Sequence, residues 1–65
     1  MTQRAKECAA RAAGALHLYV EAGVSDEESA VRDMLADLRH YCDAHDISFG
    51  NEDRCAYRNY VEELE

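Results

Sequence analysis

Apolar side chains recur at three- and four-residue steps in the first third of the chain, which is the spacing of one face of an α-helix. The repeating positions are Ala5, Cys8, Ala12, Leu16, Tyr19 and Val20. Gly23 follows them, and glycine commonly ends a helix because it adopts the left-handed conformation without strain. The pattern therefore predicts an alanine-rich helix over about residues 2–22.

A second segment has the same period and a defined start. Ser25 and Glu28 have the spacing of a capping box, in which each side chain bonds to the backbone near the other residue. The apolar positions that follow are Val31, Met34, Leu35, Leu38, Tyr41, Cys42 and His45. We expect a helix at about residues 26–45, with this stripe at the centre of the core.

The last segment begins with a short bridge and ends as a third helix. Ile47 and Phe49 alternate with a polar residue, so both side chains are expected to turn inward over the end of the bundle. Asn51 is a favourable N-cap, which predicts a helix at about residues 52–64. The inner face of this helix would consist of Ala56, Tyr57, Tyr60, Val61 and Leu64.

Three amphipathic helices with short connections predict an all-α fold, a compact three-helix bundle formed by a single domain over residues 1–65. The absence of proline supports long helices. A chain of 65 residues buries only a thin core, so a homodimer is one way in which it would gain stability. Gly14 lies inside the first helix, where the alanine and glycine content indicates close contact between helices.

Charge limits the classes of partner. The formal net charge is −7, with +2 in residues 1–20 and −9 in residues 21–65. This balance disfavours direct binding to nucleic acid or to an anionic membrane surface. No apolar run is long enough for a membrane span, and an odd number of cysteines, three, indicates free thiols in a reducing compartment. We therefore expect a cytoplasmic protein.

The sequence offers one set of candidate metal ligands. Cys42 and His45 are three residues apart on one helical face, and Cys55 begins the next helix, so a zinc-stabilised domain is conceivable. Cys42 also continues the apolar stripe, and a free cysteine often packs as a small hydrophobic residue. A nucleophilic Cys/His pair would need an orienting group, an oxyanion donor and a cleft, for which a small bundle has little room. We predict no enzymatic activity, no cofactor and no metal.

Carboxylates at one-turn spacing on the outward faces of the second and third helices suggest a surface that docks on a basic protein or imitates nucleic acid. Asp33 and Asp37 are like charges four residues apart, which is mildly unfavourable within a helix, and we expect that folding does not require them. Tyr41, Tyr57 and Tyr60 are expected to cluster around the junction of these two helices, and tyrosine favours interfaces. The candidate partner-binding residues are Asp26, Asp33, Asp37, Tyr57, Tyr60, Glu62 and Glu63. The alternative interpretation is that the acidic face is only solvated and the tyrosine rings complete the core.

The stretch from Leu35 to Glu63 resembles a known group of sequences. Its residues 37–45, Asp-Leu-Arg-His-Tyr-Cys-Asp-Ala-His, together with Ile47, Phe49, Ala56, Tyr60 and Glu63, resemble an uncharacterised family of small helical proteins from bacteria, phages and plasmids. The resemblance covers a little under half of the chain. It implies a mobile-element setting, in which anti-CRISPR and other anti-defence inhibitors are similarly short and acidic.

These observations predict a small acidic interaction protein that binds a basic, nucleic-acid-handling protein surface, as an inhibitor or DNA mimic of phage or mobile-element type would. Two alternatives stay open. The first is a homodimeric structural or regulatory protein that associates through its alanine-rich first helix. The second is the zinc-stabilised domain.

Overall fold

Three helices account for most of the protein in the computed structural model, which describes residues 1–23 and 26–64. They are α1 (Gln3–Glu21), α2 (Glu27–Ala44) and α3 (Phe49–Glu63). The described residues form no strand. The predicted all-α three-helix bundle is therefore confirmed.

The ends of α1 follow from local chemistry. Thr2 caps the first turn, because its hydroxyl accepts a hydrogen bond of 3.0 Å from the backbone N–H of Ala5. At the other end Gly23 has a φ of 98°, the left-handed conformation expected of glycine after a helix.

The start of α2 is capped by Asp26, whose carboxylate accepts the backbone N–H of Ser29 at 2.7 Å. Ser25, the predicted cap, lies outside the described residues. At the end of α2, Asp46 has a φ of 55° and the N–H of Ile47 donates to the carbonyl of Cys42 at 2.9 Å. This is the hydrogen bond of a Schellman motif, with an aspartate in the position that glycine usually occupies.

Helix α3 begins three residues earlier than predicted. Ser48, not Asn51, is the N-cap, and its hydroxyl accepts the backbone N–H of Asn51 at 3.3 Å. Phe49 is therefore the first residue of the helix and not part of a bridge. Its half-buried ring lies under the guanidinium of Arg39, 4.3 Å from the ring centroid.

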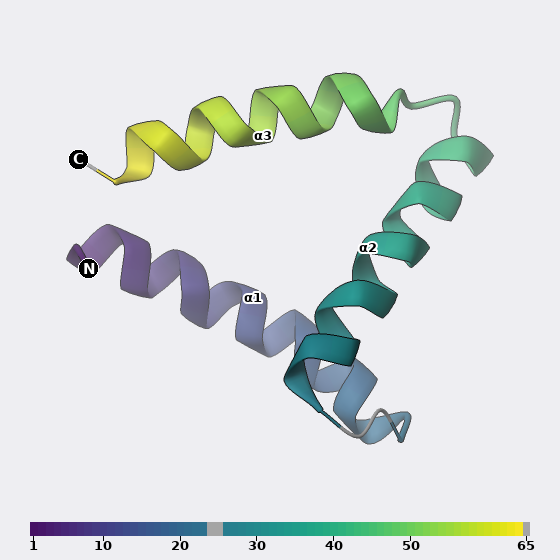
Figure 1. The fold of residues 1–65 in the computed structure, drawn as a ribbon, viewed down its shortest axis with the longest axis horizontal. Helices are drawn as coiled ribbons and strands as arrows, with labels where there is room; N and C mark the ends of the chain where they lie inside the picture. The colour runs from purple at the N-terminus through teal and green to yellow at the C-terminus, as the bar shows by residue number, and fades with distance from the viewer. Residues whose placement is uncertain (24–25, 65) are drawn as a thin grey trace.

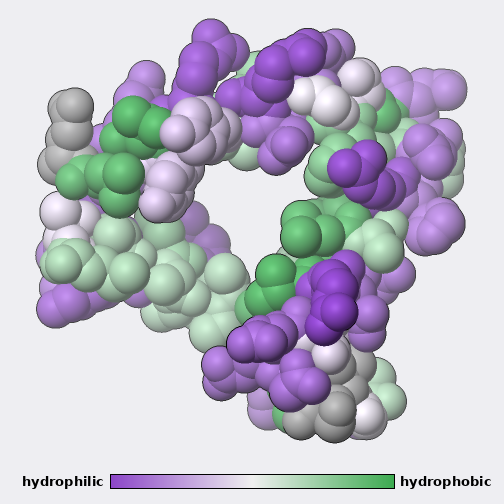
Figure 2. Space-filling view, in the orientation of Figure 1, coloured by the Kyte–Doolittle hydropathy of each residue, from purple (hydrophilic) through white to green (hydrophobic). Residues whose placement is uncertain are grey.

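The helices lie along three sides of a triangle, with the start of α1 close to the end of α3 (Figure 1). Consecutive helices pack against each other, α1 on α2 and α2 on α3. The molecule measures 34 × 29 × 15 Å, so it is about one to two helix diameters thick. The space-filling view shows an opening through the middle, with hydrophobic atoms along the inner edges of α1 and α2 (Figure 2).

The core is very small. Only Ala30 and Cys42 are buried among the described residues, at 1% and 8% exposure. Cys42 thus packs as a small hydrophobic residue. The prediction that Val31, Leu35 and Leu38 form the centre of the core is wrong, because they are 45%, 48% and 40% exposed. Helices placed around an opening leave these side chains without a neighbour to cover them.

Candidate interaction surface

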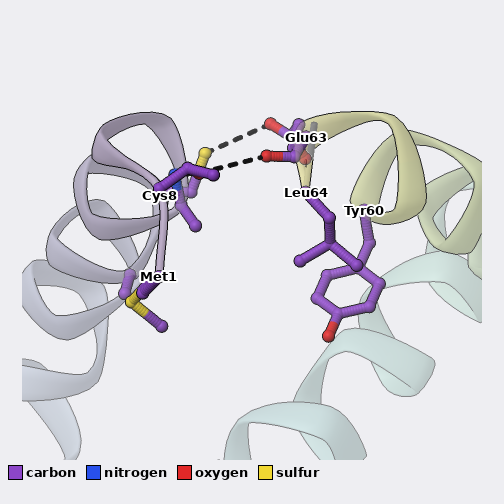
Figure 3. A pocket seen from close by; sticks show the side chains of 8 residues that line it. Met1, Cys8, Tyr60, Glu63 and Leu64 are labelled. Atoms are coloured by element: carbon purple, nitrogen blue, oxygen red, sulfur yellow. Dashed lines mark hydrogen bonds between the residues drawn. The ribbon is translucent and has the colours of Figure 1, made fainter.

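A pocket of about 750 Å³ lies between the start of α1 and the end of α3 (Figure 3). It is lined by Met1, Thr2, Ala5, Cys8, Ala9, Tyr60, Glu63 and Leu64. Most of these side chains are apolar, and in Figure 3 Met1 and Leu64 face each other across an empty space. A pocket of this size and character can accept side chains from another molecule.

Two hydrogen bonds to Glu63 close one wall of this pocket. The thiol of Cys8 donates to the carboxylate of Glu63 at 3.1 Å, and the hydroxyl of Thr2 lies 3.5 Å from its backbone carbonyl (Figure 3). The Cys8 contact raises the pKa of the thiol, first because the hydrogen bond holds the proton and then through partial desolvation and the charge of Glu63. Cys8 is accordingly a hydrogen-bond donor here and not a thiolate nucleophile.

A second groove, of about 470 Å³, lies between α1 and α2. Its lining is Ala9, Ala12, Ala13, Leu16, His17, Val20, Glu27, Ala30 and Val31. Ala9 lines both the groove and the pocket, so the two hollows meet on α1. We call the residues of α1 that line them, from Ala5 to Val20, the α1 apolar face.

An exposed apolar row continues from the groove along α2. Val31 lines the groove, and Leu35 and Leu38 follow it at steps of four and three residues, which places all three on the same side of the helix. Together with the α1 apolar face they form a surface that a soluble protein rarely leaves uncovered.

The contact between α1 and α2 includes one strong polar interaction. The hydroxyl of Tyr19 donates to the carboxylate of Asp37 at 2.7 Å. This bond raises the pKa of Tyr19, with smaller contributions from desolvation and from the negative charges of Asp37 and Asp33. Asp37 therefore has a role within the fold, contrary to the expectation that folding does not require it.

The seven predicted partner-binding residues divide into two groups. Asp26, Asp37 and Glu63 make hydrogen bonds within the chain, as a helix cap and as acceptors for Tyr19 and Cys8. The others are exposed and remain available to a partner: Asp33, Tyr57, Tyr60 and Glu62. The structure does not gather these four into one patch, since Asp33 lies on α2 beside Tyr19 and Tyr60 lines the pocket at the end of α3.

The tyrosines form pairs and not the single cluster that was expected at the junction of α2 and α3. Tyr41 stacks on His45 with ring centroids 4.3 Å apart, and Tyr57 lies 6.1 Å from Tyr60. All three tyrosine rings are at least 55% exposed, so they do not complete a core within one chain.

The candidate zinc ligands are not brought together. Cys42 is buried, His45 stacks on Tyr41, and Cys55 is exposed and accepts a hydrogen bond from Arg58 at 3.2 Å. No three of the described His, Cys, Asp and Glu side chains lie close enough to hold a metal ion. The sequence spacing that suggested a site does not produce one in this arrangement.

The pocket between α1 and α3 was not predicted from the sequence. Its polar wall joins residues 55 and 61 positions apart, and a single sequence contains no signal for such a contact. The groove between α1 and α2 was predicted in part, because Ala12, Leu16 and Val20 belong to the predicted stripe of the first helix, whereas Ala9 and Ala13 do not.

Comparisons with protein families, with curated proteins and with solved structures find no match to this chain. None of the helices in the described part is long and apolar enough to cross a lipid bilayer.

Proposed function

We propose that this is a non-catalytic interaction protein that uses the apolar surface of its helices to bind another protein chain. The observation that carries the proposal is the exposure of its hydrophobic residues. Twelve large apolar side chains are at least 39% exposed, whereas only two small residues are buried among the described residues. An apolar surface of this extent in a soluble chain is typical of a protein interface.

The total accessible surface supports the same conclusion. The chain exposes 5448 Å², whereas a compact monomer of 7.3 kDa would expose about 4,200 Å². Its radius of gyration of 13.3 Å also exceeds the value of about 11 Å for a compact 65-residue domain. The difference in area, roughly 1,300 Å², is surface that a partner would cover.

Site-specific photo-crosslinking tests this proposal. A photoreactive phenylalanine analogue would replace Leu38 on the exposed apolar row, and in a control it would replace Ala36. Both positions are exposed, but two residues along a helix correspond to a rotation of about 200°, so Ala36 lies on nearly the opposite side. We expect illumination of the native cells to yield a protein adduct from position 38 and little from position 36. Equal labelling, or no adduct at either position, would contradict the proposal.

The acidic surface supports a second candidate, an inhibitor that docks on a basic, nucleic-acid-handling protein. Asp33 and Glu62 are exposed, and within the described ranges the ion pair recorded is between His17 and Glu21, at 3.2 Å. The negative charges of Asp33 and Glu62 are therefore available to attract a basic partner. Their position on a chain with three free thiols fits the expected reducing, cytoplasmic setting.

Charge reversal tests the second candidate without disturbing the fold. The double variant Asp33→Lys, Glu62→Lys leaves the Tyr19 and Cys8 hydrogen bonds intact, so helicity should be preserved. If the acidic surface selects a basic partner, affinity capture by this variant should lose the basic proteins that the wild type retains. Replacement of the same residues by Asn and Gln is the matched control, which removes charge without reversing it. Retention of the same basic proteins by the reversed variant excludes this candidate.

A further inference from the structure

We propose that the partner that covers the apolar surface is a second copy of this chain, paired antiparallel through the α1 apolar face around a two-fold axis near Ala12. The proposal rests on the proposed interaction function and names the partner of the same surface. Three observations carry it: the shape of the face, the missing burial, and the distribution of charge.

The α1 apolar face has the form that a helix requires for close approach. It is hollowed along its length, since the pocket and the groove that meet at Ala9 extend from Met1 to Val20. Ala9, Ala12 and Ala13 in the middle are all exposed and small, so the axis of a second helix can approach to about 8 Å. Leu16 and Val20 at one end, and Tyr60 and Leu64 beside the other, supply larger side chains to fill the hollows.

The excess accessible surface of the chain is comparable to the area that a permanent dimer buries. Each chain exposes roughly 1,300 Å² more than a compact monomer of its mass, spread over all three helices, so two copies would bury about 2,600 Å² in total if their pairing covered the apolar row of α2 together with the α1 apolar face. Permanent homodimers bury about 2,000–5,000 Å², whereas a transient contact buries about 1,200 Å² or less. The quantity of uncovered surface therefore corresponds to an obligate pair.

Charge selects α1 as the contact between two acidic chains. With Arg4, Lys6 and Arg11 against Glu7 and Glu21, α1 has a net charge of +1. By the same count α2 is at −3 and α3 at −2, so contact through either would bring negative surfaces together.

The antiparallel orientation follows from the ends of α1. A crossing near Ala12 places the first turn of one α1 beside the last turn of the other; Arg4 and Glu21 lie roughly 80° and 180° around the helix from Ala12, so they form no pair across the contact. It also sets the negative end of one helix dipole beside the positive end of the other. A parallel pair would instead place like ends of the two helix dipoles together.

The experiment compares two alanines of the same helix. Ala12 and Ala10 are both exposed in the single chain. Because they are two residues apart on a helix, their side chains point in nearly opposite directions. Sedimentation velocity at micromolar concentration should give the wild type and Ala10→Glu twice the chain mass of 7.3 kDa. Ala12→Glu should give the single chain mass, or shift the dissociation constant upward by at least a hundredfold.

Disulfide crosslinking provides a second test of the α1 pairing, which still applies if the Ala12→Glu variant does not fold. In a background of Cys8→Ser and Cys55→Ser, which removes the two thiols that are not buried, Ala12→Cys should form a covalent dimer under mild oxidation. Ala10→Cys should remain a single chain. A crossing near Ala12 is required for the first result, because a disulfide needs Cα atoms within about 7 Å.

The outcomes separate this inference from the proposed function. A wild type that is helical and monomeric, or a dimer that Ala12→Glu leaves intact, overturns the α1 pairing. If crosslinking at position 38 then yields an adduct with a different protein, the interaction function stands and only the second copy is excluded. If position 38 yields no adduct of any mass and the wild type is monomeric, both fail.

Discussion

Among the described residues, two hydrogen bonds join a side chain within α1 to a carboxylate of another helix. Tyr19 donates to Asp37 of α2, and Cys8 donates to Glu63 of α3. Hydrogen bonds to an ionised acceptor are stronger than those between neutral groups. Because so few apolar contacts hold the helices, these two bonds have a large part in fixing the angles of the triangle.

The Tyr19 bond predicts a dependence of stability on alkaline pH. Folding raises the pKa of this hydroxyl, because Asp37 accepts its proton in a hydrogen bond. A raised pKa in the folded state contributes stability that is fully present below the ordinary tyrosine value, about 10, and is lost as pH rises through the folded value. We expect Tyr19→Phe to be less stable than the wild type at pH 7 and the difference to shrink above pH 10 or so.

Urea unfolding of both proteins from pH 7 to pH 11 or so measures this difference. Tyr57→Phe is the matched control, since the Tyr57 hydroxyl forms no hydrogen bond recorded for the described residues and its ring is 66% exposed. A difference between wild type and Tyr19→Phe that stays constant over this range would show that the hydroxyl bond does not control it.

At the scale of the elements, the helical period and the end of α1 at Gly23 could be predicted from the sequence, but the N-caps of α2 and α3 and the packing of the helices could not. Periodicity identified the apolar side of α2, yet Val31, Leu35 and Leu38 on that side are exposed. The hydrophobic pattern shows which face avoids water and contains no information on which surface covers it. The start of α3 was missed because Ser48 and Asn51 are both good caps, and the helix took the earlier one.

The glycine inside α1 and the glycine that follows it give predictions of opposite sign. Gly14 is helical and a Cβ there meets nothing within 4 Å, so Gly14→Ala should raise the free energy of unfolding by about 1 kcal/mol. A Cβ at Gly23 also meets nothing, but its φ of 98° is strained for alanine, so Gly23→Ala should lower it by about 1 kcal/mol.

Urea unfolding at one fixed protein concentration measures both changes, since stability depends on concentration if the chains associate. The open space at Gly14 contradicts the expectation of close helix contact there within one chain. Destabilisation by Gly14→Ala would show instead that another chain packs closely against that position.

The whole molecule combines a large apolar surface with a formal net charge of −7. The sequence showed the net charge and, from the length of the chain, a thin core, but it placed Val31, Leu35 and Leu38 at the centre of that core and not on an exposed surface. It could not show that the helices surround an opening, because the pocket between α1 and α3 depends on contacts between distant residues (Figure 2). The two candidate functions, pairing with a copy and docking on a basic protein, therefore use different properties of one molecule.

Salt separates these two functions, because it acts on them in opposite directions. Two copies, each with a net charge of −7, repel one another, and salt screens this repulsion over a Debye length that falls from about 10 Å at 0.1 M to about 3 Å at 1 M. The dimer should therefore tighten, by roughly three- to tenfold, when NaCl rises from about 0.05 M to about 0.5 M. Binding of the acidic surface to a basic protein should weaken over the same range.

Sedimentation equilibrium of the wild type across this series measures the dimer constant, and Arg4→Glu provides the control. That variant changes the net charge of α1 from +1 to −1, which increases the repulsion between the two acidic copies, so its dimer should be weaker than the wild type at low salt and should recover most of the loss at high salt. A wild-type dimer that weakens steadily with salt would mean that attraction between unlike charges, and not the apolar face of α1, holds the two chains together.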